Sequence, residues 1–129
     1  MPIIDDIVER ARRNTDFREV VSTGPHCQVV VMSLPPGEAI GEEVHLGLDQ
    51  IFVFVDGGGD AVLDGERNPV APGRLVHVMA GVRHDIVNTG QKALRFYTIY
   101  APAQHPPGTV HETRADAEAA ERRMSIPTP

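Results

Sequence analysis

The sequence has little of what marks several classes of protein. It contains a single cysteine, Cys27, so it cannot form an internal disulfide, and a lone thiol is typical of a reducing compartment such as the cytoplasm. Its longest apolar run, Ile51 to Val55, is far shorter than the roughly 18 residues that a membrane-spanning helix needs. Its first residues, MPIIDDIVERARR, place acidic side chains where a secretion signal needs a basic and then an apolar stretch. We therefore expect a cytoplasmic protein that does not bind a membrane.

An excess of positive charge is also absent. The chain has 12 lysine and arginine residues against 18 aspartate and glutamate residues, which gives a formal net charge of −6 at pH 7. Its one local concentration of basic residues is Arg10, Arg12 and Arg13. Because a phosphate backbone requires a basic face, nucleic acid is not expected as a partner.

The sequence does have the spacing of a β-rich domain. Its 129 residues suffice for one domain, and 41% of them are hydrophobic, as in an ordinary folded protein. Its 12 glycines and 11 prolines fall mostly between short runs of Val, Ile, Leu and Phe. The pair Asp64-Gly65 predicts a two-residue hairpin. This pattern favours a sandwich or a barrel, with strands expected over residues 17–22, 27–33, 42–46, 50–56, 59–63, 67–71, 75–79, 84–89 and 94–101.

Helices are predicted only near the two ends of the chain. Toward the amino terminus, apolar residues gather on one helical face, and Asn14 is expected to close that helix in the left-handed conformation. The apolar residues are Ile3, Ile4, Ile7, Val8 and Ala11. Toward the carboxyl terminus, Thr113 begins a capping box and Pro127 ends the helix that follows. We therefore divide the chain into a helical segment (1–16), a β-barrel (17–101) and a carboxy-terminal extension with a short helix (102–129).

Two of the six histidines stand out by their setting. Glu43 and His45 are two residues apart on a predicted strand, so their side chains share a face. His84 opens a later strand that a closed barrel would bring beside them. A histidine taken alone is more often structural than a ligand, which is how we interpret His77.

Two motifs in this region resemble those of the cupin superfamily. The first family motif is G-x5-H-x-H-x(3,4)-E-x6-G, and the chain matches its spacing with Gly37, Glu43, His45, Gln50 and Gly57. The second is G-x5-P-x-G-x2-H-x3-N, and the chain matches its spacing with Gly73, Met79, Gly81, His84 and Asn88. The chain departs from the family residue at positions 43, 50 and 79.

Two of the departures affect the metal ligands that the resemblance implies. In place of three imidazoles and one carboxylate, this chain offers His45, His84, Glu43 and Gln50. One change adds a carboxylate and the other removes one, so the formal charge of the set is kept. The resemblance thus implies one divalent metal ion (Fe, Mn, Ni or Zn) at these four residues. Two alternatives stay open: Glu43 orients His45 by a hydrogen bond, or the barrel is a metal-free binding cup.

The resemblance also implies a fold and a class of function. The fold is an all-β, double-stranded β-helix (cupin or jelly-roll) barrel with short terminal helices. Its function would be to bind or transform a small oxygen-rich ligand, sugar- or carboxylate-like, through the metal. An enzyme of this kind would be an isomerase or a dioxygenase, and the alternative is a non-catalytic ligand-binding or sensor cupin. The expected pocket wall, with plain barrel core as the alternative for its first four members, is Phe52, Phe54, Met79, Ile86 and His105.

The outer face of one strand suggests an oligomer. Ile51, Val53 and Val55 point away from the expected pocket, so a helix, a terminal strand or a second subunit must cover them. Small cupins commonly pair through such faces, so the resemblance implies a homodimer. The proline-rich segment 100–111 is expected either to cross the barrel mouth or to be a stiff connector.

Overall fold

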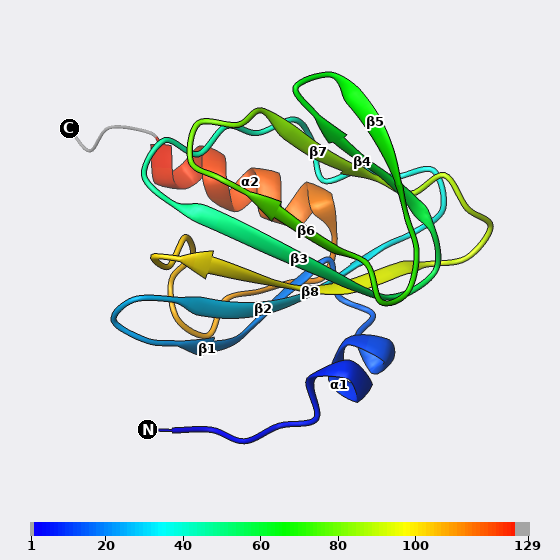
Figure 1. The fold of residues 1–129 in the computed structure, drawn as a ribbon. Helices are drawn as coiled ribbons and strands as arrows, with labels where there is room; N and C mark the ends of the chain where they lie inside the picture. Colours follow the sequence, from blue (N-terminus) through cyan, green and yellow to red (C-terminus); the bar gives the residue numbers. More distant parts are fainter. Residues whose placement is uncertain (1, 126–129) are drawn as a thin grey trace.

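The computed structural model describes residues 2–125 and shows two facing antiparallel sheets (Figure 1). The larger sheet has six strands in the order β6-β3-β8-β2-β1-β9, and the smaller has three in the order β5-β4-β7. The double-stranded β-helix fold with short terminal helices is therefore confirmed. The strands are β1 (Arg18–Thr23), β2 (Gln28–Leu34), β3 (Asp49–Asp56), β4 (Gly59–Leu63), β5 (Glu66–Val70), β6 (Leu75–Val78), β7 (His84–Val87), β8 (Leu94–Ala101) and β9 (Val110–His111).

The core lies between the two sheets. Along β3, side chains alternate between the interior and the outer face, so Phe52 and Phe54 are fully buried while Ile51 is half-buried. Their rings pack against Phe96 of β8, with centroids 5.8 and 5.3 Å away. Ile86 of β7 closes the same cluster from the smaller sheet. This aromatic layer fills the interior of the barrel, and the candidate metal ligands described below lie at one end of it.

The predicted hairpin at Asp64-Gly65 is confirmed. Asp64 has φ +49° and Gly65 has φ +82°, the pair of positive values that joins β4 to β5 through a two-residue turn. Gly59, at the start of β4, is required for a different reason. A Cβ there would lie 2.2 Å from the carbonyl oxygen of Val87 in the neighbouring strand.

The predicted strand over residues 42–46 is wrong. Within this range only Glu43 forms a β-bridge, with His84. Just before it, Ala39 forms a second bridge, with Val87. Gly41, at φ +107°, breaks the extended run, so the segment crosses the barrel as a loop pinned at two points. A strand that the sequence did not predict, β9, pairs with β1 through Arg18 and Glu19.

The amino-terminal helix is shorter than predicted. It is α1 (Ile7–Arg13), because Asp6 caps it by accepting a hydrogen bond from the Glu9 amide at 3.1 Å. Ile3 and Ile4 lie before the helix and are exposed. The expected left-handed closure is wrong: Asn14 is extended, at φ −67°. On the outer face of the larger sheet, the helix residue Ala11 packs against Val31 and Val55, which supplies part of the cover that this face requires.

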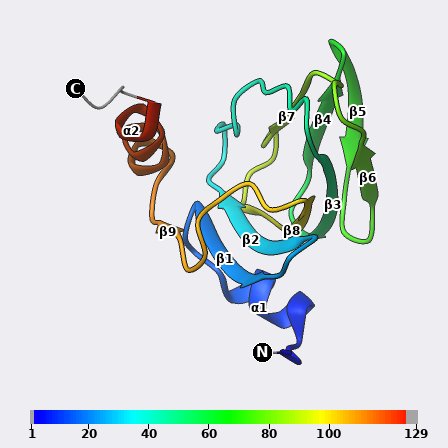
Figure 2. The same cartoon turned by 90° about the vertical axis from the view of Figure 1, so that its left-hand side faces the viewer.

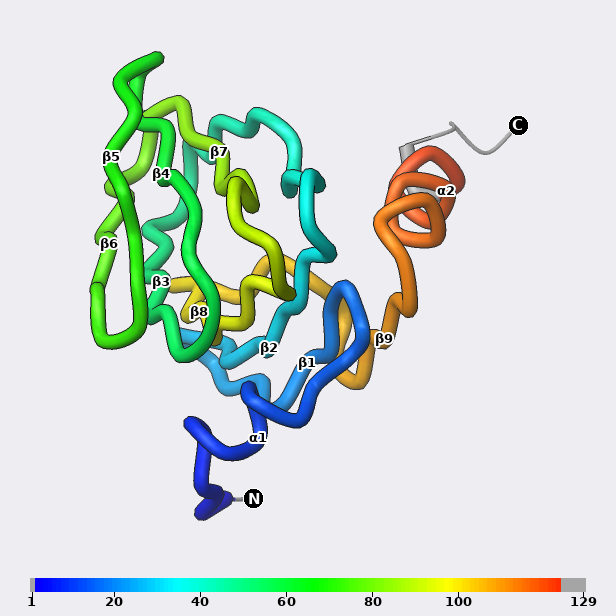
Figure 3. The backbone as a smooth tube through the Cα atoms, turned by 90° about the vertical axis from the view of Figure 1, so that its right-hand side faces the viewer, coloured from blue at the N-terminus to red at the C-terminus, as the bar shows by residue number. Residues whose placement is uncertain are grey.

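The carboxy-terminal helix, α2 (Arg114–Ser125), begins as predicted. The Thr113 hydroxyl accepts a hydrogen bond from the Asp116 amide at 3.1 Å. The predicted stop at Pro127 lies outside the described residues. Figures 2 and 3 show α2 standing beside the barrel, on the side where residues 39–46 run. No helix in the described part of the chain is long and apolar enough to cross a membrane.

Candidate metal centre

Three separate segments bring the candidate ligands together. Glu43 and His84 are joined through their backbones, each amide donating to the other's carbonyl at 2.9 Å. The Gly81 amide donates to the His45 carbonyl at 2.7 Å, which fixes the other end of the loop. Gln50 reaches the same space from β3, where it is 3% exposed. The four side chains predicted as ligands therefore lie at one end of the barrel.

The potential ligand atoms of Glu43, His45 and His84 all lie within 4.8 Å of one another. The two imidazole rings are tilted toward each other, with centroids 5.3 Å apart. Two imidazoles and one carboxylate at this separation form a donor set that divalent first-row metals accept. The group is only partly exposed, since His84 is buried and the other two are half-buried.

The Nε2 atom of His45 is the first sign that the site suits a cation. It lies 2.8 Å from Oε2 of Glu43 in an ion-pair contact that lowers the pKa of the carboxyl, although its N–H is poorly aligned with that oxygen. It is buried and has no hydrogen-bond partner among residues 2–125. A divalent metal ion could be bound by both atoms in place of this poorly aligned contact.

The contact between His84 and Gln50 is the second sign. Nδ1 of His84 faces the Val82 carbonyl at 2.9 Å, so in the neutral ring the proton sits on Nδ1 and Nε2 carries a lone pair. That Nε2 lies 3.2 Å from Oε1 of Gln50, which is also an acceptor. The Gln50 amide nitrogen donates to Oγ1 of Thr98 at 3.0 Å, which holds its oxygen toward His84. Two lone pairs thus face one space, and a cation would relieve their opposition.

Charge in the site favours an ionised carboxylate. Burial acts to raise the pKa of Glu43, but the contact with His45 and the charges of His45, Arg18 and His84 outweigh it. The pKa of Glu43 is therefore held below its usual range. An anionic Glu43 supplies the negative charge that a divalent ligand set requires.

Two neighbours of the site were not predicted as parts of it. Tyr100 of β8 lies with its ring centroid 6.3 Å from that of His45, and burial raises its pKa above the usual range, so the phenol keeps its proton. Thr98, two residues earlier, orients Gln50. Both lie on the inward face of β8 with Phe96, and that two-residue alternation was the signal that could have found them.

The residues predicted to line the pocket wall lie in three different places in the structure. Three of them belong to the packed core and are fully buried: Phe52, Phe54 and Ile86. Met79 is 54% exposed on the turn after β6, so its assignment to the interior wall is wrong. Alternation explains this, because Val78 points inward and the next residue must point out. His105 packs edge-on against Tyr100, 5.2 Å between centroids, and burial together with the Arg18 charge lowers its pKa to about 3.

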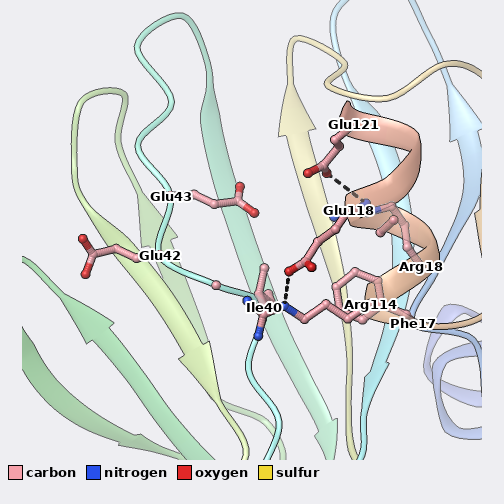
Figure 4. Close-up of a pocket in the computed structure, with 10 residues that line it drawn as sticks. Phe17, Arg18, Ile40, Glu42, Glu43, Arg114, Glu118 and Glu121 are labelled. Atoms are coloured by element: carbon pink, nitrogen blue, oxygen red, sulfur yellow. Dashed lines mark hydrogen bonds and ion pairs between the residues drawn. The ribbon is translucent and has the colours of Figure 1, made fainter. Parts of the chain in front are cut away.

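A cavity of about 240 Å³ extends from the site toward α2. Figure 4 shows Glu43 on one side of this space and Glu118 and Glu121 of α2 on the other. It is smaller than the pockets of about 300–1,000 Å³ that hold drug-sized ligands, so it suits a molecule of a few heavy atoms. Its lining residues are Phe17, Arg18, Ile40, Gly41, Glu42, Glu43, Arg114, Ala117, Glu118 and Glu121.

The chain is similar to several known proteins. The uncharacterized protein YrkC of Bacillus subtilis is 42% identical over 127 residues, which cover 93% of this chain and 68% of YrkC. A crystal structure of a Bacillus halodurans protein superposes with a TM-score of 0.91 and 39% identity, covering 92% of this chain and 95% of that one. An oxalate-binding protein of Thermotoga maritima is 32% identical over 68 residues, 53% of this chain and 56% of that protein.

The match to a family model covers the part of the chain that builds the barrel and holds all four candidate ligands. The model of the cupin domain matches residues 30–100, from β2 through β8. Since that is more than half of the chain, the protein belongs to the cupin family.

Proposed function

We propose that this cupin holds one divalent metal ion at Glu43, His45, Gln50 and His84 and binds a small, oxygen-rich ligand through it. The observation that carries the proposal is the cluster of Glu43, His45 and His84, whose potential ligand atoms all lie within 4.8 Å of one another, with the buried Nε2 of His45 in a close but poorly aligned contact with the Glu43 carboxylate. The contact of His84 Nε2 with Oε1 of Gln50 at 3.2 Å, in which both atoms are acceptors when the imidazole is neutral, supports it as well. Iron, manganese, nickel and zinc all accept two imidazoles and one carboxylate with open positions.

The bound ion would supply Lewis-acid polarisation of a ligand oxygen. The chain's own residues would position that ligand: Tyr100 keeps a proton and offers a hydroxyl beside His45, and the cavity toward α2 admits the rest of the molecule. The Thermotoga maritima relative is named for oxalate binding, which supports a small carboxylate as the class of ligand. Reversible binding is the function this geometry supports, and isomerase or dioxygenase chemistry would build on the same ion.

Metal analysis of the protein purified without a chelator or a metal-affinity column tests this proposal. About one equivalent of a divalent metal is expected in the wild type, and little in His45→Ala and His84→Ala. His77→Ala is the matched control, since this histidine of β6 is exposed and lies outside the cluster. The barrel should remain folded in all variants, because its core is apolar and not held by the ion. Equal metal content in all four proteins, or none in the wild type, would favour a metal-free binding cup.

We also propose that two copies pair through the outer face of the larger sheet. α1 covers only part of that face, and a groove remains beside it, lined by apolar side chains that include Val21, Val29 and Ile99. An apolar groove of this kind is a usual position for a subunit contact. Cys27 is exposed and free, which supports a reducing compartment such as the cytoplasm.

A further inference from the structure

A buried arginine stands at the border between the metal centre and α2. Arg18 of β1 is 3% exposed, packs over the Phe17 ring with its guanidinium carbon 5.2 Å from the ring centroid, and is a side-chain hydrogen-bond partner of Tyr100. Its Nη1 lies 3.6 Å from Oε1 of Glu121 and 3.4 Å from Nδ1 of His111, both longer than a charge-assisted hydrogen bond. Its Nε is buried and has no hydrogen-bond partner in residues 2–125. A buried Nε–H without a partner, beside a long ion pair, is costly, and a ligand carboxylate could satisfy it.

Arg18 and the metal centre share one cavity. Arg18 and Glu43 line the same space of about 240 Å³, from opposite sides (Figure 4). The positive charge of Arg18 also acts on Glu43, on Tyr100 and on His105, so it lies within electrostatic reach of the site and of the segment beside it. A small molecule in the cavity could therefore touch both the ion and the guanidinium.

The other charged groups of the cavity are already paired. Arg114 donates to Oε1 of Glu118 at 2.8 Å and to the Ala39 carbonyl at 3.0 Å. Glu42 accepts from Arg83 at 2.7 Å. Among these lining cations of the described chain, Arg18 is thus the one with a buried donor, Nε, left without a partner, and Glu121 is the carboxylate that faces it at 3.6 Å.

We infer that Arg18 binds a carboxylate of the ligand whose other end is held by the metal, and that Glu121 occupies the place of that carboxylate until the ligand arrives. The planar guanidinium fork fits a carboxylate with two parallel hydrogen bonds. Glu121 is 57% exposed on α2, so its long contact is easily given up. The ligand class is a small molecule with two oxygen-bearing ends, of which a dicarboxylate is the simplest.

This inference rests on the proposed function. The cavity is lined by four carboxylates and only two guanidinium groups, an excess of negative charge that would repel a free anion. A divalent ion at the metal centre balances this excess, so carboxylate binding should require the metal.

Titration calorimetry on the metal-loaded full chain tests the inference in two stages. Metal affinity is measured first for the wild type and for Arg18→Met, Glu121→Gln and Glu118→Gln. Oxalate, malonate and succinate are then titrated into each protein, with malonamide as the uncharged probe and inorganic phosphate as the alternative anion. Glu118→Gln is the matched control, because it removes the same charge from the same helix and cavity but from a residue that faces Arg114.

The expected results move in opposite directions. Arg18→Met keeps or tightens the metal, because it removes a positive charge near Glu43, and weakens the best dicarboxylate at least about tenfold. Glu121→Gln tightens that dicarboxylate about two- to fivefold, and Glu118→Gln changes it less. Malonamide, which carries no charge, should bind every one of these proteins more weakly than the best dicarboxylate does.

Failure of the inference differs from failure of the proposed function. A wild type that binds no metal contradicts the proposed function. A wild type that binds metal but none of the dicarboxylates, or that binds them equally well after Arg18→Met, overturns the inference alone. Phosphate binding tighter than every dicarboxylate would overturn the carboxylate assignment. The side chain of Glu121 is exposed, so Glu121→Gln should leave the barrel folded. It therefore remains a test even if Arg18→Met is poorly folded.

Discussion

The two unusual members of the ligand set can be altered separately, and the order of metal affinities that results is a sharp prediction. Gln50→Glu replaces a neutral oxygen with a carboxylate oxygen at the same reach, beside Nε2 of His84. Glu43→Gln removes the one carboxylate of the cluster and keeps its shape. We expect metal to bind most tightly to Gln50→Glu, then to the wild type, and most weakly to Glu43→Gln.

The magnitude follows from charge and burial. Two unit charges 4 Å apart attract by about 4 kcal/mol at the effective dielectric of a protein surface, and a ligand lies closer than this to a divalent ion. Desolvation of the carboxylate offsets part of the gain, since Gln50 is 3% exposed. A net difference of about 1.5–3 kcal/mol for each step corresponds to roughly 10- to 150-fold in the dissociation constant.

Without metal, Gln50→Glu should be less stable than the wild type, which is the reverse of their order in metal affinity. Without an ion, the new carboxylate is buried near Glu43 and loses the amide donation to Thr98, so the free energy of unfolding should fall by about 1–3 kcal/mol. A metal-stripped Gln50→Glu protein that is less stable than the wild type, but more stable once loaded, would show that the new charge faces the ion. A merely structural effect would lower both.

The assay combines competition with a chromogenic chelator and thermal unfolding at several free-metal concentrations. At a free metal concentration of 100 times Kd, the wild type should gain about 2.7 kcal/mol, or on the order of 10 °C in melting temperature. Glu43→Gln should gain much less at the same concentration. Binding to Glu43→Gln as tight as to the wild type, or weaker binding to Gln50→Glu, would refute the ligand assignment.

Three further predictions concern stability and assembly. Gly59→Ala should lower the free energy of unfolding in urea by about 3 kcal/mol, because its Cβ would collide with the Val87 carbonyl, whereas Gly47→Ala, where nothing lies within 4 Å, should change it by less than about 0.5 kcal/mol. His105→Gln should make the protein less sensitive to acid: burial lowers the pKa of His105 to about 3 from an ordinary 6.5, so the unfolded chain takes up a proton that the folded chain refuses, and stability falls as the pH drops through that window. A His105→Gln protein with an unchanged pH–stability profile between pH 6.5 and 3 would contradict this. Light scattering at micromolar concentration should give twice the chain mass of 14.0 kDa, and a mass of one chain would exclude the homodimer.

Much of the fold could be predicted because its signals are local. The alternation that buries Phe52 and Phe54, the Asp64-Gly65 turn and the Thr113 cap each depend on a few consecutive residues and on backbone geometry alone. Local patterns also misled where tertiary structure intervened. Residues 42–46 look like a strand, but Gly41 and a single bridge to His84 make them a pinned loop.

The sequence by itself indicated a cupin barrel and four candidate ligands, through the resemblance of its two motifs to those of the cupin superfamily. Only the tertiary structure decided what surrounds them. Alternation along β8 puts Tyr100 on the inward face but does not say that it meets His45, and no pattern along the chain relates Arg18 of β1 and Glu121 of α2 to the ligands. The physical reason is that a strand's period fixes which side of the sheet a residue faces, whereas barrel closure and helix docking fix what it faces across the cavity.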